Sequence, residues 1–90
     1  MHAFLENKTL AVIIPVYNEE KALRSNFESI HTLFLQDGIV CKYLYVDDGS
    51  KDQTWQVLTV LTQDYPCVSA IKFARNFGKE IALRAGVESI

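Results

Sequence analysis

Two neighbouring carboxylates, Asp47 and Asp48, directly follow the apolar run Tyr43–Val46. Adjacent carboxylates repel each other unless hydrogen-bond donors or a cation satisfy them. A nucleoside supplies such donors, because its base carries an imino N–H and its ribose carries hydroxyl groups. A plain turn built on Asp48 and Gly49, with Ser50 capping a following helix, is the structural alternative. We expect both carboxylates to take part in binding a nucleotide.

A second candidate segment, Val16–Glu19, places an aromatic ring, an amide and a carboxylate in succession after another apolar run. The ring of Tyr17 could stack on a planar base, a contact that contributes about 1–3 kcal/mol in nucleic-acid binders. Structurally, Asn18 could cap a helix while Glu19 interacts with the positive end of its dipole. Helix capping does not explain a large aromatic residue in a tight turn, so both interpretations stay open for Asn18.

The third candidate segment, Arg75–Lys79, contains two cations, a glycine that permits close approach of the backbone, and the expected start of a helix. A helix N-terminus flanked by Arg75 and Lys79 suits a diphosphate. The alternative is a solvated basic loop with a helix cap. Aromatic residues elsewhere in the chain are expected in the core: Phe27, Phe34, Trp55 and Phe77.

The elements that must position these segments alternate along the chain. Pro15 ends the first apolar run, Asn18 and a capping box of Ser50 with Gln53 are expected to open two helices, and Pro66 follows the second. Strands are predicted at Leu10–Ile14, Tyr43–Val46 and Val68–Phe73, and helices from Asn18 to about Asp37, from Ser50 to before Pro66, and at Glu80–Ser89. This βαβαβα order predicts an α/β fold with a parallel sheet and right-handed crossovers. Ligands bind at the carboxyl ends of such strands, where all three candidate segments lie.

Length and composition limit the remaining classes. Ninety residues predict one domain, and 49% hydrophobic with 22% charged residues disfavour disorder, collagen and coiled coil. A net charge of −2 argues against general nucleic-acid binding, so we expect no nucleic-acid partner. Because no apolar stretch reaches the roughly 20 residues of a membrane span, we expect a cytoplasmic chain. Cys41 and Cys67 are then expected to be reduced thiols, and His2 and His31 to have no functional role.

Other nucleotide-binding signatures do not occur. The chain has no G-x-G-x-x-G motif after its first strand and no G-x-x-x-x-G-K-[ST] motif, which disfavours a dinucleotide oxidoreductase and a P-loop ATPase. The acidic pair follows the second predicted strand, whereas a phosphoacceptor signalling domain would have it after the first.

With these segments placed, the sequence resembles the N-terminal part of family 2 glycosyltransferases, which have the GT-A (Rossmann-like) fold. It resembles most closely the branch that transfers a sugar to a polyprenyl phosphate, such as dolichol-phosphate mannose synthases and bactoprenol glucosyltransferases. Three motifs carry the resemblance: Val12–Glu20, Tyr45–Asp52 with Thr54, and Phe73–Glu80 with Ala85 and Gly86. The third motif indicates the polyprenyl-phosphate branch.

The resemblance implies that residues 1–90 form a single partial domain, the nucleotide-sugar-binding part of a glycosyltransferase. It assigns no catalytic residue. Pro15 and Tyr17 would frame the base, Glu19 and Asp47 would bind base and ribose, and Arg75 and Lys79 would lie along the nucleotide. The full set of expected nucleotide-binding residues is Pro15, Tyr17, Asn18, Glu19, Asp47, Asp48, Gly49, Arg75 and Lys79.

The resemblance also sets expectations for the complete enzyme. Family members hold Mg²⁺ or Mn²⁺ with an Asp-x-Asp motif, which would lie beyond Ile90, so we expect no metal ligands in this chain. The complete protein would bind a nucleoside-diphosphate sugar and a polyprenyl phosphate at the cytoplasmic face of a membrane, in the synthesis of a cell-envelope glycan. We expect residues 1–90 alone to be inactive and to self-associate through an exposed sheet edge. The alternative is a truncated, non-catalytic remnant or a nucleotide-binding module.

Overall fold

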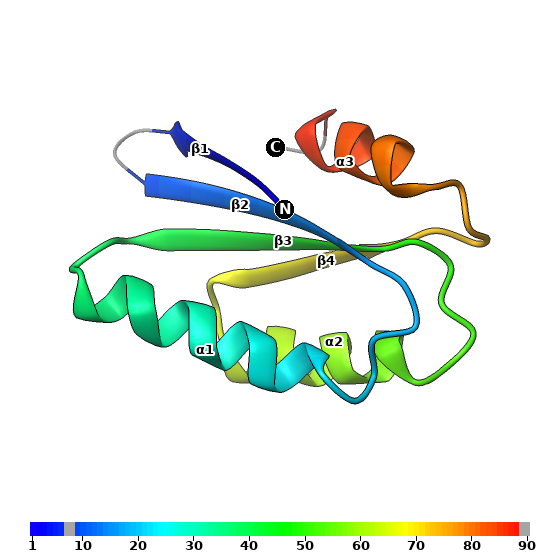
Figure 1. Cartoon of the computed structure of the whole chain (residues 1–90), viewed down its shortest axis with the longest axis horizontal. Helices are drawn as coiled ribbons and strands as arrows, with labels where there is room; N and C mark the ends of the chain where they lie inside the picture. The colour runs from blue at the N-terminus through cyan, green and yellow to red at the C-terminus, as the bar shows by residue number, and fades with distance from the viewer. Residues whose placement is uncertain (7–8, 89–90) are drawn as a thin grey trace.

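The computed structural model describes residues 1–6 and 9–88 of the chain, which form one four-stranded sheet with helices on both faces. The strands lie side by side in chain order: β1 (His2–Glu6), β2 (Thr9–Val16), β3 (Cys41–Asp47) and β4 (Val68–Lys72). Strands β2, β3 and β4 are parallel, whereas β1 pairs antiparallel to β2 (Figure 1). The predicted α/β class with a parallel sheet is therefore confirmed.

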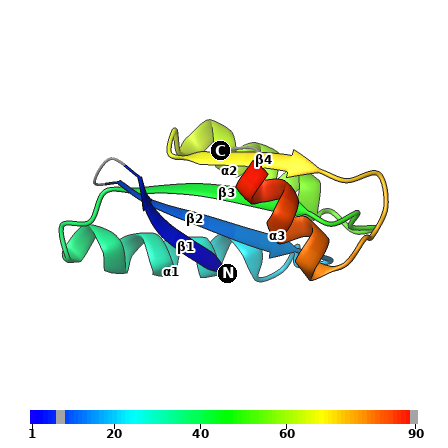
Figure 2. The ribbon, with the colours of Figure 1, turned by 90° about the horizontal axis from the view of Figure 1, so that it is seen from above.

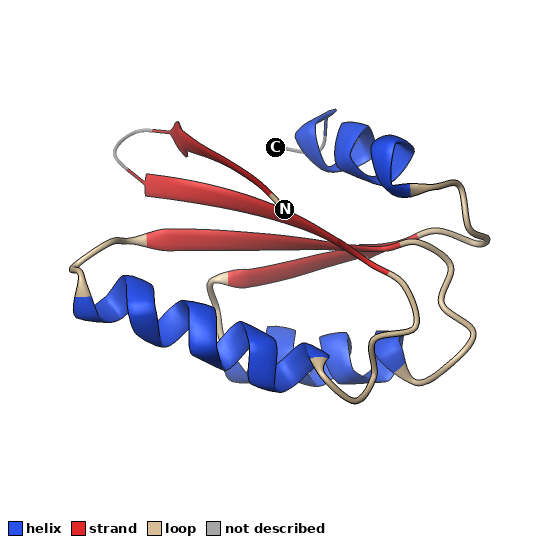
Figure 3. Ribbon diagram, in the orientation of Figure 1, coloured by secondary structure: helices blue, strands red, loops and turns tan. Residues whose placement is uncertain are grey.

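Three helices connect and cover the strands: α1 (Leu23–Gln36), α2 (Thr54–Asp64) and α3 (Lys79–Glu88). Helices α1 and α2 lie on one face of the sheet and α3 lies on the other (Figure 3). Seen from above, α3 crosses the sheet over β2 and β3, the two strands that it contacts (Figure 2). Because β2, β3 and β4 are parallel, the loops that follow them lie at the same end of the sheet.

The alternation of side chains along β3 divides the core into two parts. Tyr43 and Tyr45 face α1 and α2, where they pack in the larger cluster with Phe27. Val46 faces α3 and packs with Ile13 and Ala82 in the smaller cluster. This division follows from the period-2 pleat of a strand that is buried on both sides.

Close packing of α3 depends on a glycine. A Cβ atom on Gly86 would lie 2.5 Å from the Cγ2 atom of Ile13. Glycine at this position therefore lets the helix approach β2 directly.

The first strand was not predicted, because Met1–Thr9 has neither a continuous apolar run nor a clear alternation. It forms because β2 would otherwise expose an unpaired edge, and β1 satisfies that edge from His2 opposite Ile13 to Glu6 opposite Thr9. The sheet thus has four strands rather than three, and its outer strands are β1 and β4.

The predicted starts of the first two helices, α1 and α2, are wrong. Helix α1 begins at Leu23, because Asn18 adopts a left-handed φ of +52° and its side chain does not cap the helix. Helix α2 begins at Thr54 and has no capping box, because the Ser50 hydroxyl accepts a hydrogen bond from another loop. The Asp52 carboxylate instead accepts the Thr54 backbone N–H at 2.9 Å.

The predicted core aromatics divide by burial. Phe27 is fully buried, and Phe34 and Trp55 are half-buried against the same cluster. Phe77 is 41% exposed, so its placement in the core is wrong. Its ring packs edge-on against Phe73 and lies 4.7 Å from the Arg75 guanidinium, a cation–π contact at the surface. The predicted third helix extended to Ser89, which lies outside the described residues.

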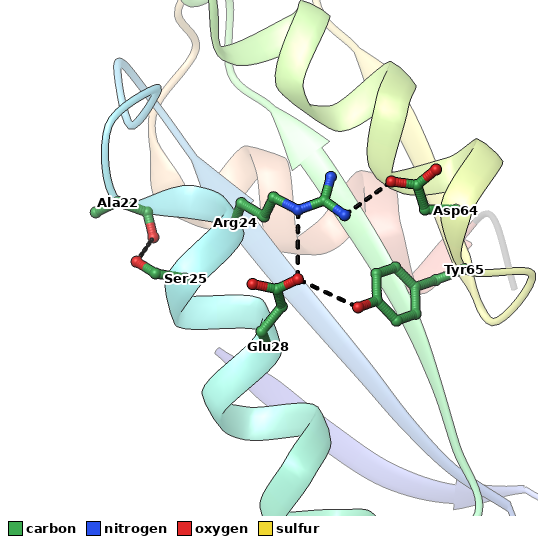
Figure 4. Close-up of polar contacts among 6 residues, drawn as sticks. All are labelled: Ala22, Arg24, Ser25, Glu28, Asp64 and Tyr65. Carbon is green, nitrogen blue, oxygen red and sulfur yellow. Dashed lines mark hydrogen bonds and ion pairs between the residues drawn. The ribbon is translucent and has the colours of Figure 1, made fainter.

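A polar network joins α1 to the end of α2 (Figure 4). Arg24 donates to Asp64 at 2.7 Å and to Glu28 at 3.3 Å, and the Tyr65 hydroxyl donates to Glu28 at 3.2 Å. At the start of α1, the Ser25 hydroxyl donates to the Ala22 carbonyl. The network fixes the two helices relative to each other below the sheet.

Cys41 and Cys67 are both free thiols, and burial raises the pKa of each. His31 contributes to packing: its ring stacks on Phe27, and its Nδ1 atom lies 3.2 Å from the Tyr43 hydroxyl. Within residues 1–6 and 9–88, no helix is long and apolar enough to cross a membrane.

Candidate functional site

The loops after β2, β3 and β4 meet at the carboxyl end of the sheet, on the right in Figure 1. We call them loop A (residues 17–22), loop B (residues 48–53) and loop C (residues 73–78). They contain most of the residues that the sequence indicated as candidates for nucleotide binding.

Loops A and B are joined by hydrogen bonds between side chains and backbone. The Asn18 backbone N–H donates to the Ser50 hydroxyl at 2.8 Å, and the Asn18 side-chain oxygen accepts the Lys51 N–H at 2.9 Å. The Glu19 N–H donates to the hydroxyl of Thr54 at 2.8 Å. The two loops therefore hold each other in place, and Asn18 is committed to this contact on both its backbone and its side chain.

Loops B and C are joined by Asp48 and Gly49. One carboxylate oxygen of Asp48 accepts the Phe77 N–H at 2.8 Å and the other accepts the Gly78 N–H at 3.0 Å. Gly49 has a φ of +74°, and a Cβ atom there would lie 2.3 Å from the carbonyl carbon of Arg75. Only glycine permits this approach of the two backbones.

These contacts involve the two amides that precede α3. The sequence suggested that the N-terminus of this helix, together with Arg75 and Lys79, suits a diphosphate. The amides of Phe77 and Gly78 already have an acceptor, the Asp48 carboxylate. Helix α3 itself begins at Lys79, so these two amides are not its own first amides.

A cavity of about 140 Å³ opens between the end of β2, loops A and B, and the first residue of α3. Its wall is formed by Pro15, Val16, Tyr17, Glu19, Asp48 and Lys79. Five of these six residues are among the nine that the sequence singled out, and Val16 was not. Tyr17 is 39% exposed, so part of its ring is accessible to a ligand. The cavity combines two carboxylates, one ammonium group and an aromatic ring.

The other four predicted residues, Asn18, Asp47, Gly49 and Arg75, lie around this cavity rather than in its wall. Asn18 and Gly49 shape the loops, as described above. Arg75 is exposed, and its guanidinium covers the ring of Phe77.

Asp47 is fully buried beneath the loops, on the strand face that carries Tyr43 and Tyr45. Its Oδ1 atom accepts the Ser50 N–H at 2.9 Å, whereas its Oδ2 atom has no hydrogen-bond partner among the described residues. A buried carboxylate oxygen without a donor is unfavourable, and in native proteins such atoms are rare. Asp47 therefore retains an unused acceptor close to the site.

Sequence reasoning missed two residues that organise the site, Asp52 and Thr54. They occur in the second motif, but the motif alone indicated no role for either. Desolvation raises the pKa of Asp52, but hydrogen bonds from the side chain and backbone of Thr54 and from the backbone of Glu20 hold it below its ordinary value. Asp52 is therefore an anion that these donors stabilise.

Across residues 1–6 and 9–88, no group of three or more His, Cys, Asp or Glu side chains is arranged to hold a metal ion. The paired carboxylates do not form such a group, because Asp47 and Asp48 contact different loops on opposite sides of β3.

Comparison with known proteins gives a consistent result. The family model described as Glycosyl transferase family 2 matches residues 11–89. A prophage bactoprenol glucosyl transferase homolog of Escherichia coli (strain K12) is 33% identical, over 88% of this chain and 26% of its own length. A glycosyltransferase of Synechocystis sp. is 38% identical, over 88% of this chain and 25% of its own length. The chain thus spans about a quarter of the length of these relatives.

A solved structure supports the fold. A mannosyltransferase from Pyrobaculum calidifontis, determined in complex with GDP-Man and Mn²⁺, superposes with a TM-score of 0.75. The match covers 89% of this chain and 24% of the mannosyltransferase, with 22% sequence identity. The described part of the chain therefore has the Rossmann-like fold of this mannosyltransferase, as the sequence predicted.

Proposed function

This chain belongs to glycosyl transferase family 2, and from that membership we propose that residues 1–90 form the nucleotide-sugar-binding part of a glycosyltransferase. In the complete protein, the enzyme transfers a sugar from a nucleoside-diphosphate sugar to a polyprenyl phosphate. The observation that carries the proposal is the cavity between the end of β2, loops A and B, and the start of α3, whose wall contains five of the nine residues singled out for nucleotide binding.

Each wall residue has a chemistry suited to one part of the nucleotide. The half-exposed ring of Tyr17 provides a stacking surface for the base, with Pro15 beside it. Glu19 accepts hydrogen bonds from base or ribose. Asp48 can accept further hydrogen bonds, because each of its oxygens has two lone pairs and only one is used by the amides of loop C.

Charged and buried groups near the cavity complete the proposed site. Lys79 in the wall and Arg75 at its rim supply positive charge for the diphosphate. Asp47 is buried outside the cavity wall, so we assign it an indirect role through loop B, whose Ser50 N–H its carboxylate accepts. Glu19 and Asp48 therefore recognise donors, and Lys79 and Arg75 recognise phosphate oxygens.

The acceptor and the metal are proposed for the complete protein. Relatives in Escherichia coli and a Shigella phage are named as a bactoprenol glucosyl transferase homolog and a bactoprenol glucosyl transferase, which supports a polyprenyl phosphate acceptor. We propose that the complete protein acts at the cytoplasmic face of a membrane. The solved mannosyltransferase contains Mn²⁺, which supports a requirement for Mg²⁺ or Mn²⁺. We place the metal ligands outside residues 1–90.

Calorimetry of the 90-residue chain tests the proposal. Uridine and guanosine diphosphates are titrated with and without Mn²⁺, and we expect saturable binding of at least one of them. Absence of binding by both, with a circular dichroism spectrum of a folded chain, would contradict the proposed function.

The second candidate is a nucleotide-binding module without activity of its own. Both candidates predict nucleotide binding, so sugar transfer separates them. We expect no transfer by residues 1–90 from a sugar nucleotide to polyprenyl phosphate, and transfer by a longer chain that includes the remaining length of the relatives.

A further inference from the structure

Thr54, the first residue of α2, lies where loops A and B meet. Its side chain is fully buried, and its hydroxyl accepts the Glu19 N–H at 2.8 Å while donating to the Asp52 carboxylate. A hydroxyl carries one proton and two lone pairs, so it can serve both partners at once. Thr54 therefore connects loop A to Asp52 through a single buried group.

Asp52 extends this connection by one residue. Its Oδ2 atom accepts the Glu20 N–H at 3.3 Å, and its Oδ1 atom accepts the Thr54 N–H at 2.9 Å. Two consecutive amides of loop A, those of Glu19 and Glu20, are thus bound by the start of α2. Neither Asp52 nor Thr54 belongs to the wall of the cavity.

Loop A needs such support because its backbone is irregular. It leaves β2 at Val16, passes through the left-handed Asn18, and enters α1 only at Leu23. Tyr17 and Glu19 in the cavity wall are carried by this stretch. A loop that is already fixed loses less conformational freedom when a ligand binds, which increases affinity.

We infer that Asp52 and Thr54 are positioning residues of the nucleotide cavity, acting through the backbone amides of Glu19 and Glu20. The inference rests on the proposed function for the identity of the ligand. Removing the Thr54 hydroxyl should loosen loop A and weaken nucleotide binding, although no atom of Thr54 lines the cavity. A residue that only supports the start of α2 would lower stability and leave the affinity of the folded chain unchanged.

The test uses Thr54→Val, which removes the hydroxyl and nearly preserves the shape of the side chain. Thr59→Val is the matched control, because Thr59 lies exposed on the same helix and its hydroxyl donates only to the Trp55 carbonyl. Two quantities are measured on the 90-residue chain. They are the hydrogen-exchange rate of the Glu19 amide by NMR, and the affinity for uridine and guanosine diphosphates by calorimetry.

We expect Thr54→Val to accelerate exchange of the Glu19 amide and to raise the nucleotide Kd roughly three- to tenfold, as loss of one buried hydrogen bond predicts. Thr54→Ser retains the hydroxyl and should restore both values. Thr59→Val should change neither. Unchanged exchange or unchanged Kd in Thr54→Val would overturn the inference.

A second variant, Asp52→Asn, tests the positioning role if Thr54→Val does not fold. Asp52→Asn keeps the size of the side chain but places an amide where the carboxylate accepts two backbone N–H groups. We expect faster exchange of the Glu20 amide and a raised Kd, and an unchanged Kd would overturn the inference. A wild-type chain that binds neither nucleotide overturns the proposed function itself, whereas wild-type binding with unchanged variants overturns only the positioning role.

Discussion

Asp47 and Asp48 are neighbours in the sequence, yet each organises a different part of the site. Asp47 lies on the face of α1 and α2 and accepts the Ser50 N–H within loop B. Asp48 accepts two amides at the start of α3, on the other side of the strand end. Because the two carboxylates diverge, they are poorly placed to chelate one cation. The two carboxylates therefore stabilise two different loops and do not bind a common ion.

Tyr17 is the residue whose substitution tests nucleotide recognition most directly. We expect Tyr17→Ala to weaken binding of the nucleoside diphosphate by about 1–3 kcal/mol through loss of base stacking. The fold should persist, because the side chain is 39% exposed at the end of the sheet. Calorimetric titration gives the affinity. Tyr17→Phe keeps the ring and should bind as wild type, and an unchanged affinity in Tyr17→Ala would remove this side chain from the site.

At the scale of elements, the three loops form an interlocked unit, and this is where sequence reasoning reached its limit. Asn18, Ser50 and Gly78 are residue types that favour turns and helix caps. Each was interpreted within its own loop, but Asn18 and Ser50 are bonded to each other across 32 positions of sequence. A capping residue and a cross-loop partner use the same chemistry, so composition alone does not distinguish them.

Gly49 tests whether contact between loops B and C is needed for the fold. Gly49→Ala should lower the free energy of unfolding by roughly 1–2 kcal/mol from its positive φ, and by roughly 1–3 kcal/mol more from overpacking against loop C. Urea denaturation measures the change. Gly38→Ala is the control, since Gly38 also has a positive φ of +71° but has no atom within 4 Å of the added Cβ. Equal losses of unfolding free energy in Gly49→Ala and Gly38→Ala would show that the close approach of loops B and C does not affect stability.

The pKa of Asp52 predicts how this loop unit responds to acid. Because the pKa of Asp52 is held below its ordinary value, the hydrogen bonds of the Asp52 carboxylate add stability that is fully present above the unfolded-state pKa. That stability is lost as the pH falls through the lower, folded-state pKa. We expect the urea midpoint to decline as the pH falls below the ordinary pKa of an aspartate, about 3.9, and to decline less in Asp52→Asn. Parallel curves for the two proteins would exclude Asp52 as a source of this dependence.

At the scale of the whole molecule, the apolar runs at Leu10–Ile14 and Tyr43–Val46 were sufficient to predict the parallel sheet and that the candidate segments follow its strands at one end. A strand buried on both faces has a strong sequence signal. Strand β1 has a weak one, because its residues form neither a continuous apolar run nor a clear alternation, and only its antiparallel pairing with β2 identifies it as a strand. For the same reason Phe77 was misplaced: an aromatic residue in a loop is buried only if another element covers it.

Phe27 is the residue on which the larger core depends, and its removal is the most severe test of the architecture. Its ring is fully buried and lies 4.9 Å from that of Tyr43 and 4.8 Å from that of Tyr65, so it joins α1, β3 and the end of α2. A domain of this length is typically stable by roughly 5–13 kcal/mol. Phe27→Ala should lower that value by about 3–5 kcal/mol.

Such a loss leaves little margin, so we expect Phe27→Ala to melt at a much lower temperature or to be unfolded at 25 °C, as measured by circular dichroism. Phe34→Ala is the matched control, since Phe34 lies on the same helix but is only half-buried. We expect Phe34→Ala to lower the free energy of unfolding less than Phe27→Ala does. A cooperative melt of Phe27→Ala close to that of the wild type would mean that the sheet does not need α1 for its stability. Loop A would then be held by loop B and the start of α2 alone.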